Sequence, residues 1–172
     1  MSNKIAVLVG SMRKDSFNRK MAQVLISLAP KSIEPQLIEI SDLSLYNQDL
    51  DDENRAPAAW THFREQMSSC QGVLFVTPEY NRSVPGVLKN AIDVGSRPYG
   101  QSIWGGKPCA IMSVSPGAIG GFGANHHLRQ SLVFLDMPTM QQPEAYIGQA
   151  TTLFNQDGTI TKEDTLKLLQ HF

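Results

Sequence analysis

The fold of this chain is decided by residues 5–18, IAVLVGSMRKDSFN, near its start. Residues 5–9 are all apolar, which predicts a strand buried on both faces, because a strand with one exposed face alternates apolar and polar residues. A polar loop follows from Gly10, and a helical spacing of apolar residues begins at Phe17. A buried strand that leads through a polar loop into a helix predicts a parallel α/β sheet.

The rest of the chain repeats this alternation of short apolar runs with segments of helical spacing. Further strands are predicted at 35–40, 72–77, 109–112 and 137–140. Helices are predicted at 17–29, 57–70, 85–94, 123–135 and 162–171, and the segment 41–55 is predicted to be irregular. The 172 residues, 41% of them hydrophobic, suffice for one compact core and are too few for two ordinary domains. We therefore expect one α/β domain over residues 1–172, with a five-stranded parallel sheet.

Composition excludes several classes of partner. The net charge of −1 leaves no excess of cations to attract nucleic acid, so nucleic-acid binding is not expected. No apolar run is long enough to cross a bilayer, and none near the start resembles a signal peptide, which predicts a cytoplasmic protein without membrane contact. Cys70 and Cys109 are far apart and lack the spacing of zinc ligands, so a metal site is not expected. Small-molecule partners are favoured.

Three of the predicted strands end in loops of unusual composition. The first loop comprises residues 10–18, the second 78–83 and the third 113–121. The carboxyl ends of parallel strands meet at one edge of a sheet, and ligands bind there in the crevice where the strand order reverses. The sequence therefore predicts a binding site at this edge.

The first loop has the composition of an anion site. Ser11, Ser16 and Asn18 offer hydrogen-bond donors, Arg13 is a permanent cation, and the helix that follows begins with free backbone N–H groups. The loop matches neither the dinucleotide pattern GxGxxG nor the Walker pattern, so a nucleoside triphosphate is not implied. Ser16 alone is equally well explained as an ordinary N-cap, and Arg13 favours the phosphate.

The second loop continues to residue 86 as PEYNRSVPG, with an aromatic residue and a carboxylate between two prolines. Prolines restrict the backbone, so this segment is expected to form a stiff platform for the polar edge of a flat ring. An ordinary strand-to-helix connection with a solvated Glu79 is the alternative. The third loop is rich in glycine, which lets the backbone approach a ligand closely, and Ser115 is placed to reach it.

These motifs resemble those of a known family. The first loop reads Gly10-Ser11-x-Arg13-x-x-Ser16-x-Asn18, and the second continues to residue 93 as TPEYNxSVPGxLKNAID from residue 77. Residues 106–108 (GKP) and 128–130 (LRQ) extend the likeness over nearly the whole chain. The chain resembles the NAD(P)H-dependent FMN reductases of flavodoxin-like fold, particularly the bacterial quinone and chromate reductases. The resemblance implies a three-layer αβα sandwich with strand order 2-1-3-4-5.

The resemblance also implies an activity and a set of cofactor-binding residues. It implies that FMN passes two electrons from NAD(P)H to quinones, chromate, azo compounds or similar acceptors, with no catalytic side chain, in a homodimer or homotetramer. It places these residues around the FMN phosphate: Ser11, Arg13, Ser16, Phe17 and Asn18. It places these along the isoalloxazine: Pro78, Glu79, Tyr80, Asn81, Arg82 and Ser115. Position 82 is often tyrosine in similar proteins and is arginine here.

Alternatives stay open. They are an FMN reductase that supplies reduced flavin to a partner oxygenase, a flavodoxin-like electron carrier, and a fold relative that only binds an anion. Flavodoxins are strongly acidic, whereas this chain is nearly neutral. Lys89, Asn90 and Asp93 are expected to serve subunit contact or capping. The stretch 132–135 fits either an interface or a cover for the sheet.

Overall fold

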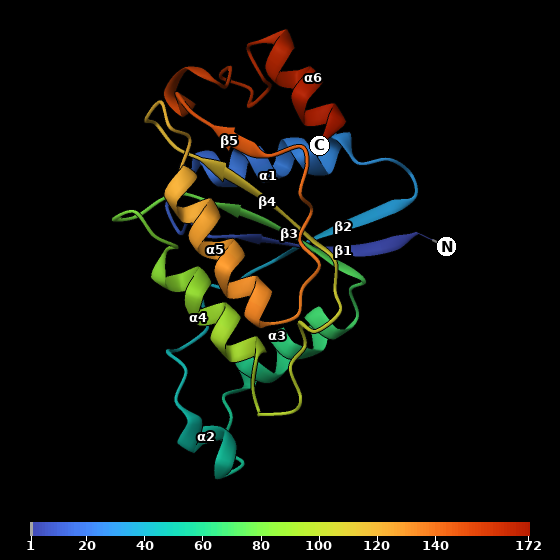
Figure 1. The fold of residues 1–172 in the computed structure, drawn as a ribbon, viewed down its shortest axis with the longest axis vertical. Helices are drawn as coiled ribbons and strands as arrows, with labels where there is room; N and C mark the ends of the chain where they lie inside the picture. The colour runs from blue at the N-terminus through green and yellow to red at the C-terminus, as the bar shows by residue number, and fades with distance from the viewer. Residues whose placement is uncertain (1) are drawn as a thin grey trace.

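A single parallel sheet forms the middle layer of the molecule (Figure 1). The computed structural model describes residues 2–172. The strands are β1 Asn3–Val9, β2 Ile33–Ile38, β3 Gly72–Thr77, β4 Cys109–Val114 and β5 Ala145–Ile147. Their spatial order is β2-β1-β3-β4-β5, and every neighbouring pair is parallel. The predicted fold and strand order are confirmed.

Helices cover both faces of this sheet, which makes three layers (Figure 1). They are α1 Phe17–Leu28, α2 Gln48–Asp52, α3 Ala58–Ser68, α4 Gly86–Gly95, α5 Phe122–Phe134 and α6 Glu163–His171, with a short 3₁₀ helix at Ala150–Thr152. Helices α1 and α6 lie on one face, and α3, α4 and α5 lie on the other. None of the helices among residues 2–172 has both the length and the apolar character that crossing a membrane requires.

Each face of the sheet carries its own hydrophobic core. Ala6 and Leu8 of β1 belong to the core under α3, α4 and α5, whereas Val7 and Val9 belong to the core under α1 and α6. Successive residues of a strand point to opposite faces, so a central strand between two cores must be apolar at every position. This alternation explains the uninterrupted apolar run with which the chain begins.

The fifth strand was predicted in the wrong place. Residues 137–140 form no strand, and Thr139 makes only an isolated bridge to Cys109. Pro138 has no N–H group to donate to a ladder, so the segment runs past the start of β4 and the chain joins the sheet only at β5. β5 has 3 residues, which is too short for an alternating pattern to reveal.

Buried polar side chains fix the connection between β2 and α3, which also contains the unexpected helix α2. The Asn90 amide on α4 accepts a hydrogen bond from the Tyr46 amide at 2.8 Å and donates to the carbonyls of Leu43 and Ser44. The Arg64 guanidinium on α3 donates to Asp51 on α2 at 2.7 and 2.8 Å. Asn90 therefore anchors this connection within the chain.

Candidate functional site

The three loops meet at the carboxyl edge of the sheet, as predicted. In the strand register Val9 pairs with Val76, and Thr77 pairs with Ser113, so the loops that follow begin side by side. Gly10 permits this approach, because a Cβ atom there would lie 3.0 Å from the Thr77 hydroxyl and 3.2 Å from Leu88. The first and second loops are thus in direct contact.

The first loop leaves a row of backbone donors unused. The Ser16 hydroxyl accepts a hydrogen bond from the Arg19 amide at 3.2 Å, which confirms the N-cap alternative. Yet within residues 2–172 the amides of 11–15, 17 and 18 donate to no protein acceptor. Ser16 therefore caps α1, while the other amides at this helix start remain available to an anion.

Asn18 ties the first loop to the end of β4. Its side-chain amide donates to the Val114 carbonyl at 3.2 Å, and the residue is only 4% exposed. Its Oδ1 atom is buried without a hydrogen-bond partner among the described residues. A buried acceptor without a donor is costly, so this atom points to a ligand that donates. Ser11 is buried as well, whereas Arg13 is exposed and lies over the Phe17 ring at 6.0 Å.

The second loop contains a tight hairpin turn that sequence reasoning did not predict. Tyr80 and Ser83 exchange both backbone hydrogen bonds, at 3.1 and 3.0 Å, around a two-residue tip. Asn81 and Arg82 at this tip have φ values of 51° and 62°. Positive φ at both central residues is the geometry of a type I′ hairpin, so the tip of the loop is closed by its own backbone hydrogen bonds.

Glu79 is used inside the protein. One oxygen of its carboxylate accepts a hydrogen bond from the Ala124 amide at the start of α5, at 3.0 Å, and the other accepts from the Arg82 guanidinium at 3.0 Å. The Glu79 side chain is 13% exposed. The alternative of a solvated Glu79 is therefore wrong, and this carboxylate joins the second loop to α5.

The third loop is folded against β5 and the residues after it. The Ser115 hydroxyl accepts a hydrogen bond from the Gly117 amide at 3.0 Å, so it shapes the loop. Gly120 has φ +64°, and a Cβ atom there would lie 2.5 Å from the Tyr146 carbonyl carbon. Only glycine fits this position, which brings the loop close to the edge of the crevice.

An aromatic cluster beside the third loop was missed by sequence reasoning. Phe122 and His126 on α5 pack together at 4.2 Å between ring centroids, and the His126 Nε2 atom lies 2.8 Å from the Tyr146 hydroxyl. Burial, with the nearby Glu144 carboxylate, raises the pKa of Tyr146 to about 12, so the phenol stays protonated at neutral pH. The only sign of this cluster in the sequence is the spacing of four residues between Phe122 and His126, which puts both rings on one face of a helix.

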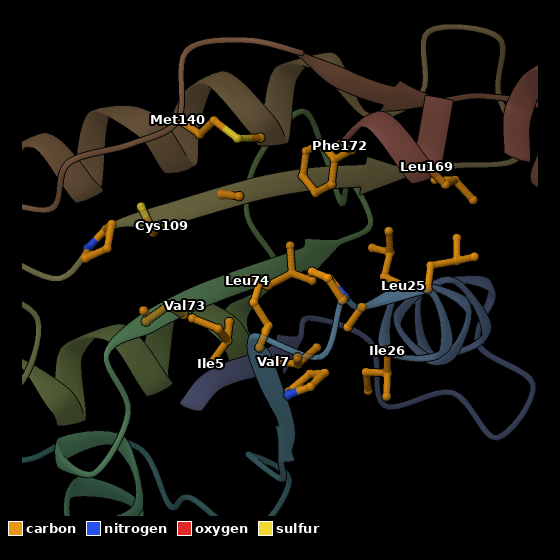
Figure 2. Close-up of a pocket in the computed structure, with 18 of the residues that line it drawn as sticks. Ile5, Val7, Leu25, Ile26, Val73, Leu74, Cys109, Met140, Leu169 and Phe172 are labelled. Carbon is orange, nitrogen blue, oxygen red and sulfur yellow. The ribbon is translucent and has the colours of Figure 1, made fainter. Parts of the chain in front are cut away.

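A cavity of about 720 Å³ lies elsewhere, between α1, α6 and the starts of the strands. Figure 2 shows Leu25, Leu74 and Phe172 around it. The described residues that line it are mostly apolar and include no arginine. A phosphate cannot be desolvated there without compensating hydrogen bonds, so the three loops, and not this apolar cavity, make the candidate site.

Comparison with known proteins decides the family. A family model described as NADPH-dependent FMN reductase matches residues 3–152. The chain belongs to this family. The match to the NADPH-dependent FMN reductases includes all five strands and all three loops, and it ends before α6.

Similar individual proteins have names that agree with this family assignment. The chain is 62% identical over 168 residues to a quinone reductase from Pseudomonas putida, a match that covers 98% of this chain and 89% of the relative. It is 50% identical to a 2-hydroxy-1,4-benzoquinone reductase from Burkholderia sp., with 100% and 93% covered. Among solved structures, the flavoenzyme NAD(P)H:(acceptor) oxidoreductase FerB from Paracoccus denitrificans matches with a TM-score of 0.91 at 44% identity, covering 99% of this chain and 92% of that one.

Proposed function

We propose that this chain is an FMN-dependent oxidoreductase that transfers two electrons from NAD(P)H to quinones or similar small acceptors. The observation that carries the proposal is the row of unused amides in the first loop, beside the buried Oδ1 atom of Asn18 that lacks a donor. FMN has a phosphate that accepts hydrogen bonds and a ribityl chain whose hydroxyls donate them, so it satisfies both kinds of group. Bound FMN supplies the hydride chemistry.

The proposed roles of the site residues follow from their chemistry. In the first loop Ser11, Arg13, Ser16, Phe17 and Asn18 hold the phosphate and the ribityl chain. Arg13 lies next to the free amides and supplies the positive charge that a phosphate dianion needs. Asn18 accepts from a ribityl hydroxyl, and its bond to Val114 keeps it in place.

The second and third loops hold the ring in this proposal. Residues 78–82 and Ser115 offer backbone groups to the polar edge of the isoalloxazine, because the side chain of Glu79 is already engaged with Ala124 and Arg82. N–H donors that are fixed before the reaction stabilise negative charge as it develops on the ring. No side chain has to act as a nucleophile or an acid.

Quinones are the first acceptors to test, because the relatives with 62% and 50% identity bear the names of quinone and hydroxybenzoquinone reductases. The proposal further includes a single domain over residues 1–172, a homodimer or homotetramer, and a cytoplasmic location. Cys70 and Cys109 are both free and buried, which suits a reducing compartment.

The test begins with the protein freed of ligand. We expect it to bind FMN with at most micromolar Kd, measured by quenching of flavin fluorescence, and the loaded protein to oxidise NADPH or NADH when 1,4-benzoquinone is present. Failure to bind FMN, or failure to oxidise either nucleotide, would refute the proposal. Gel filtration of the loaded protein separates an enzyme that retains FMN from one that releases it to a partner.

Arg13→Gln should weaken FMN binding about tenfold, because a charge-assisted hydrogen bond to phosphate contributes roughly 1.5 kcal/mol or more. Arg55→Gln is the matched control, since Arg55 is exposed and pairs with Glu53. The control makes the same change of charge and should bind FMN like the unaltered protein. Equal affinities of the two variants would remove Arg13 from the phosphate site.

A further inference from the structure

Arg82 has an unusual place for an arginine. It is the second residue at the tip of the hairpin, with φ 62°, in the left-handed region that long side chains rarely adopt. The hydrogen bonds between Tyr80 and Ser83 fix the backbone on both sides of it. The direction in which the Arg82 side chain leaves the loop is therefore set by the turn.

The guanidinium of Arg82 is tethered at one nitrogen and otherwise open. Its Nη1 atom donates to Glu79 at 3.0 Å, and its side chain is 75% exposed. Gly123 at the start of α5 lies directly behind, since a Cβ atom there would lie 2.9 Å from the Glu79 carboxylate and 3.3 Å from the Arg82 carbonyl. Arg82 thus lies at the tip of the second loop beside the start of α5, and among the described residues its guanidinium has only the one partner, so its other N–H groups can bind a ligand.

Glu79 does not cancel the charge of Arg82. The carboxylate also faces the amide of Ala124, at the positive end of a helix of 13 residues. One negative charge is thus shared between two positive partners, and water screens the ion pair on the side of Arg82, whose side chain is exposed. The guanidinium of Arg82 therefore keeps part of its charge available to a ligand.

We propose that Arg82 selects electron acceptors that carry a negative charge, such as quinones with a sulfonate or an ionised hydroxyl group. The inference rests on the proposed function, because it requires a flat acceptor in the crevice between the loops. The proposed function places the second loop against the flavin ring, so Arg82 on that loop would lie close to substituents attached to the flat ring of an acceptor. The 2′-phosphate of NADPH is at the far end of a long dinucleotide from the nicotinamide, and it is the less suitable partner.

The first experiment measures binding without turnover. Isothermal calorimetry on FMN-loaded, oxidised protein compares naphthalene-2-sulfonate with naphthalene-2-sulfonamide, which has nearly the same shape and no charge. We expect Arg82→Gln to reduce the preference for the sulfonate about fivefold, and added salt to reduce it in the unaltered protein. Arg82→Lys should retain most of the preference, and Arg55→Gln, which removes a charge far along the chain, should retain all of it.

The second experiment measures selectivity in turnover. The ratio of kcat/KM for 1,4-naphthoquinone-2-sulfonate to that for 2-methyl-1,4-naphthoquinone should fall about fivefold in Arg82→Gln, per mole of bound FMN. The same two acceptors are used for every variant, so their intrinsic reactivities cancel.

Three results would overturn the inference: an unchanged ratio in Arg82→Gln, an equal fall in Arg55→Gln, or a change confined to the preference between NADPH and NADH. Failure of the proposed function is distinguishable, because the unaltered protein would then reduce neither quinone.

Discussion

Gly120 shows how one position without a side chain sets the shape of the third loop. Its φ of +64° disfavours any side chain, and its close approach to the peptide between Tyr146 and Ile147 leaves no room for a Cβ atom. Gly100 has φ +83° with no atom nearby, and Gly105 has neither restriction. The three glycines therefore separate the cost of backbone conformation from the cost of crowding.

We predict that Gly120→Ala lowers the free energy of unfolding by about 2–4 kcal/mol, because it adds a clash with the backbone to the conformational strain. Gly100→Ala should lose about 1 kcal/mol from strain alone, and Gly105→Ala should lie within about 0.5 kcal/mol of the unaltered protein. Urea unfolding followed by circular dichroism measures all three. A loss at Gly120 no larger than that at Gly100 would contradict the close approach.

At the same scale, sequence reasoning found those residues whose partners are near in the chain. The Ser16 hydroxyl accepts a hydrogen bond from the Arg19 amide, three positions on, and a serine just before a helix is a local pattern that predicts such a cap. Glu79 binds Ala124, which is 45 residues away, so no local pattern could reveal that its carboxylate is engaged. The free Oδ1 of Asn18 likewise depends on Val114, on another strand.

Among the helices and strands, those that are buried could be predicted from the sequence, because burial requires a recognisable pattern of apolar residues. Residues 5–9 of β1 and 73–76 of β3 lie between two cores and are all apolar, so their sequences alone identified these strands. β5 lies at the edge with 3 residues and was misplaced. Helix α2 has no buried residue and hence no apolar period to detect, and it is held instead by the ion pair between Asp51 and Arg64.

That ion pair predicts a pH dependence of stability. The hydrogen bonds from Arg64 hold the pKa of Asp51 below its ordinary value of 3.8, so the pair stabilises the fold above pH 4 and this contribution is lost as the pH falls through the lowered pKa. Asp51→Asn should cost about 2–4 kcal/mol at pH 7, because it leaves a largely buried arginine unpaired. It should also flatten the fall of stability between pH 5 and pH 3.

Asp52→Asn is the control for this prediction, since Asp52 is the exposed neighbour on the same short helix. Urea unfolding at several pH values should give the Asp52 variant the same pH profile as the unaltered protein. An unchanged profile for Asp51→Asn as well would show that the pair contributes nothing to acid sensitivity.

The molecule as a whole exposes apolar side chains at the end of α5. Leu132 is buried, whereas Val133 and Phe134 are 74% and 89% exposed. Leu132 therefore helps to cover the sheet, whereas Val133 and Phe134 do not. Exposed apolar side chains that lie together are typical of contacts between subunits.

If this end of α5 joins subunits, Phe134→Asp should reduce the molar mass measured by multi-angle light scattering at micromolar concentration, because it places a charge in an apolar contact. Ser32→Asp adds the same charge at another exposed position and should leave the mass unchanged. An identical mass for both variants would place the interface elsewhere.

The unused amides of the first loop couple ligand supply to the survival of the fold. Only the folded chain assembles this row, so FMN at a hundred times its Kd adds about 2.7 kcal/mol to the free energy of unfolding. Unfolding is what exposes a chain to proteases, and a difference of this size alters the unfolded fraction by about a hundredfold. In a cell starved of riboflavin, the protein should therefore become scarce, and its abundance would report the flavin status of the cell.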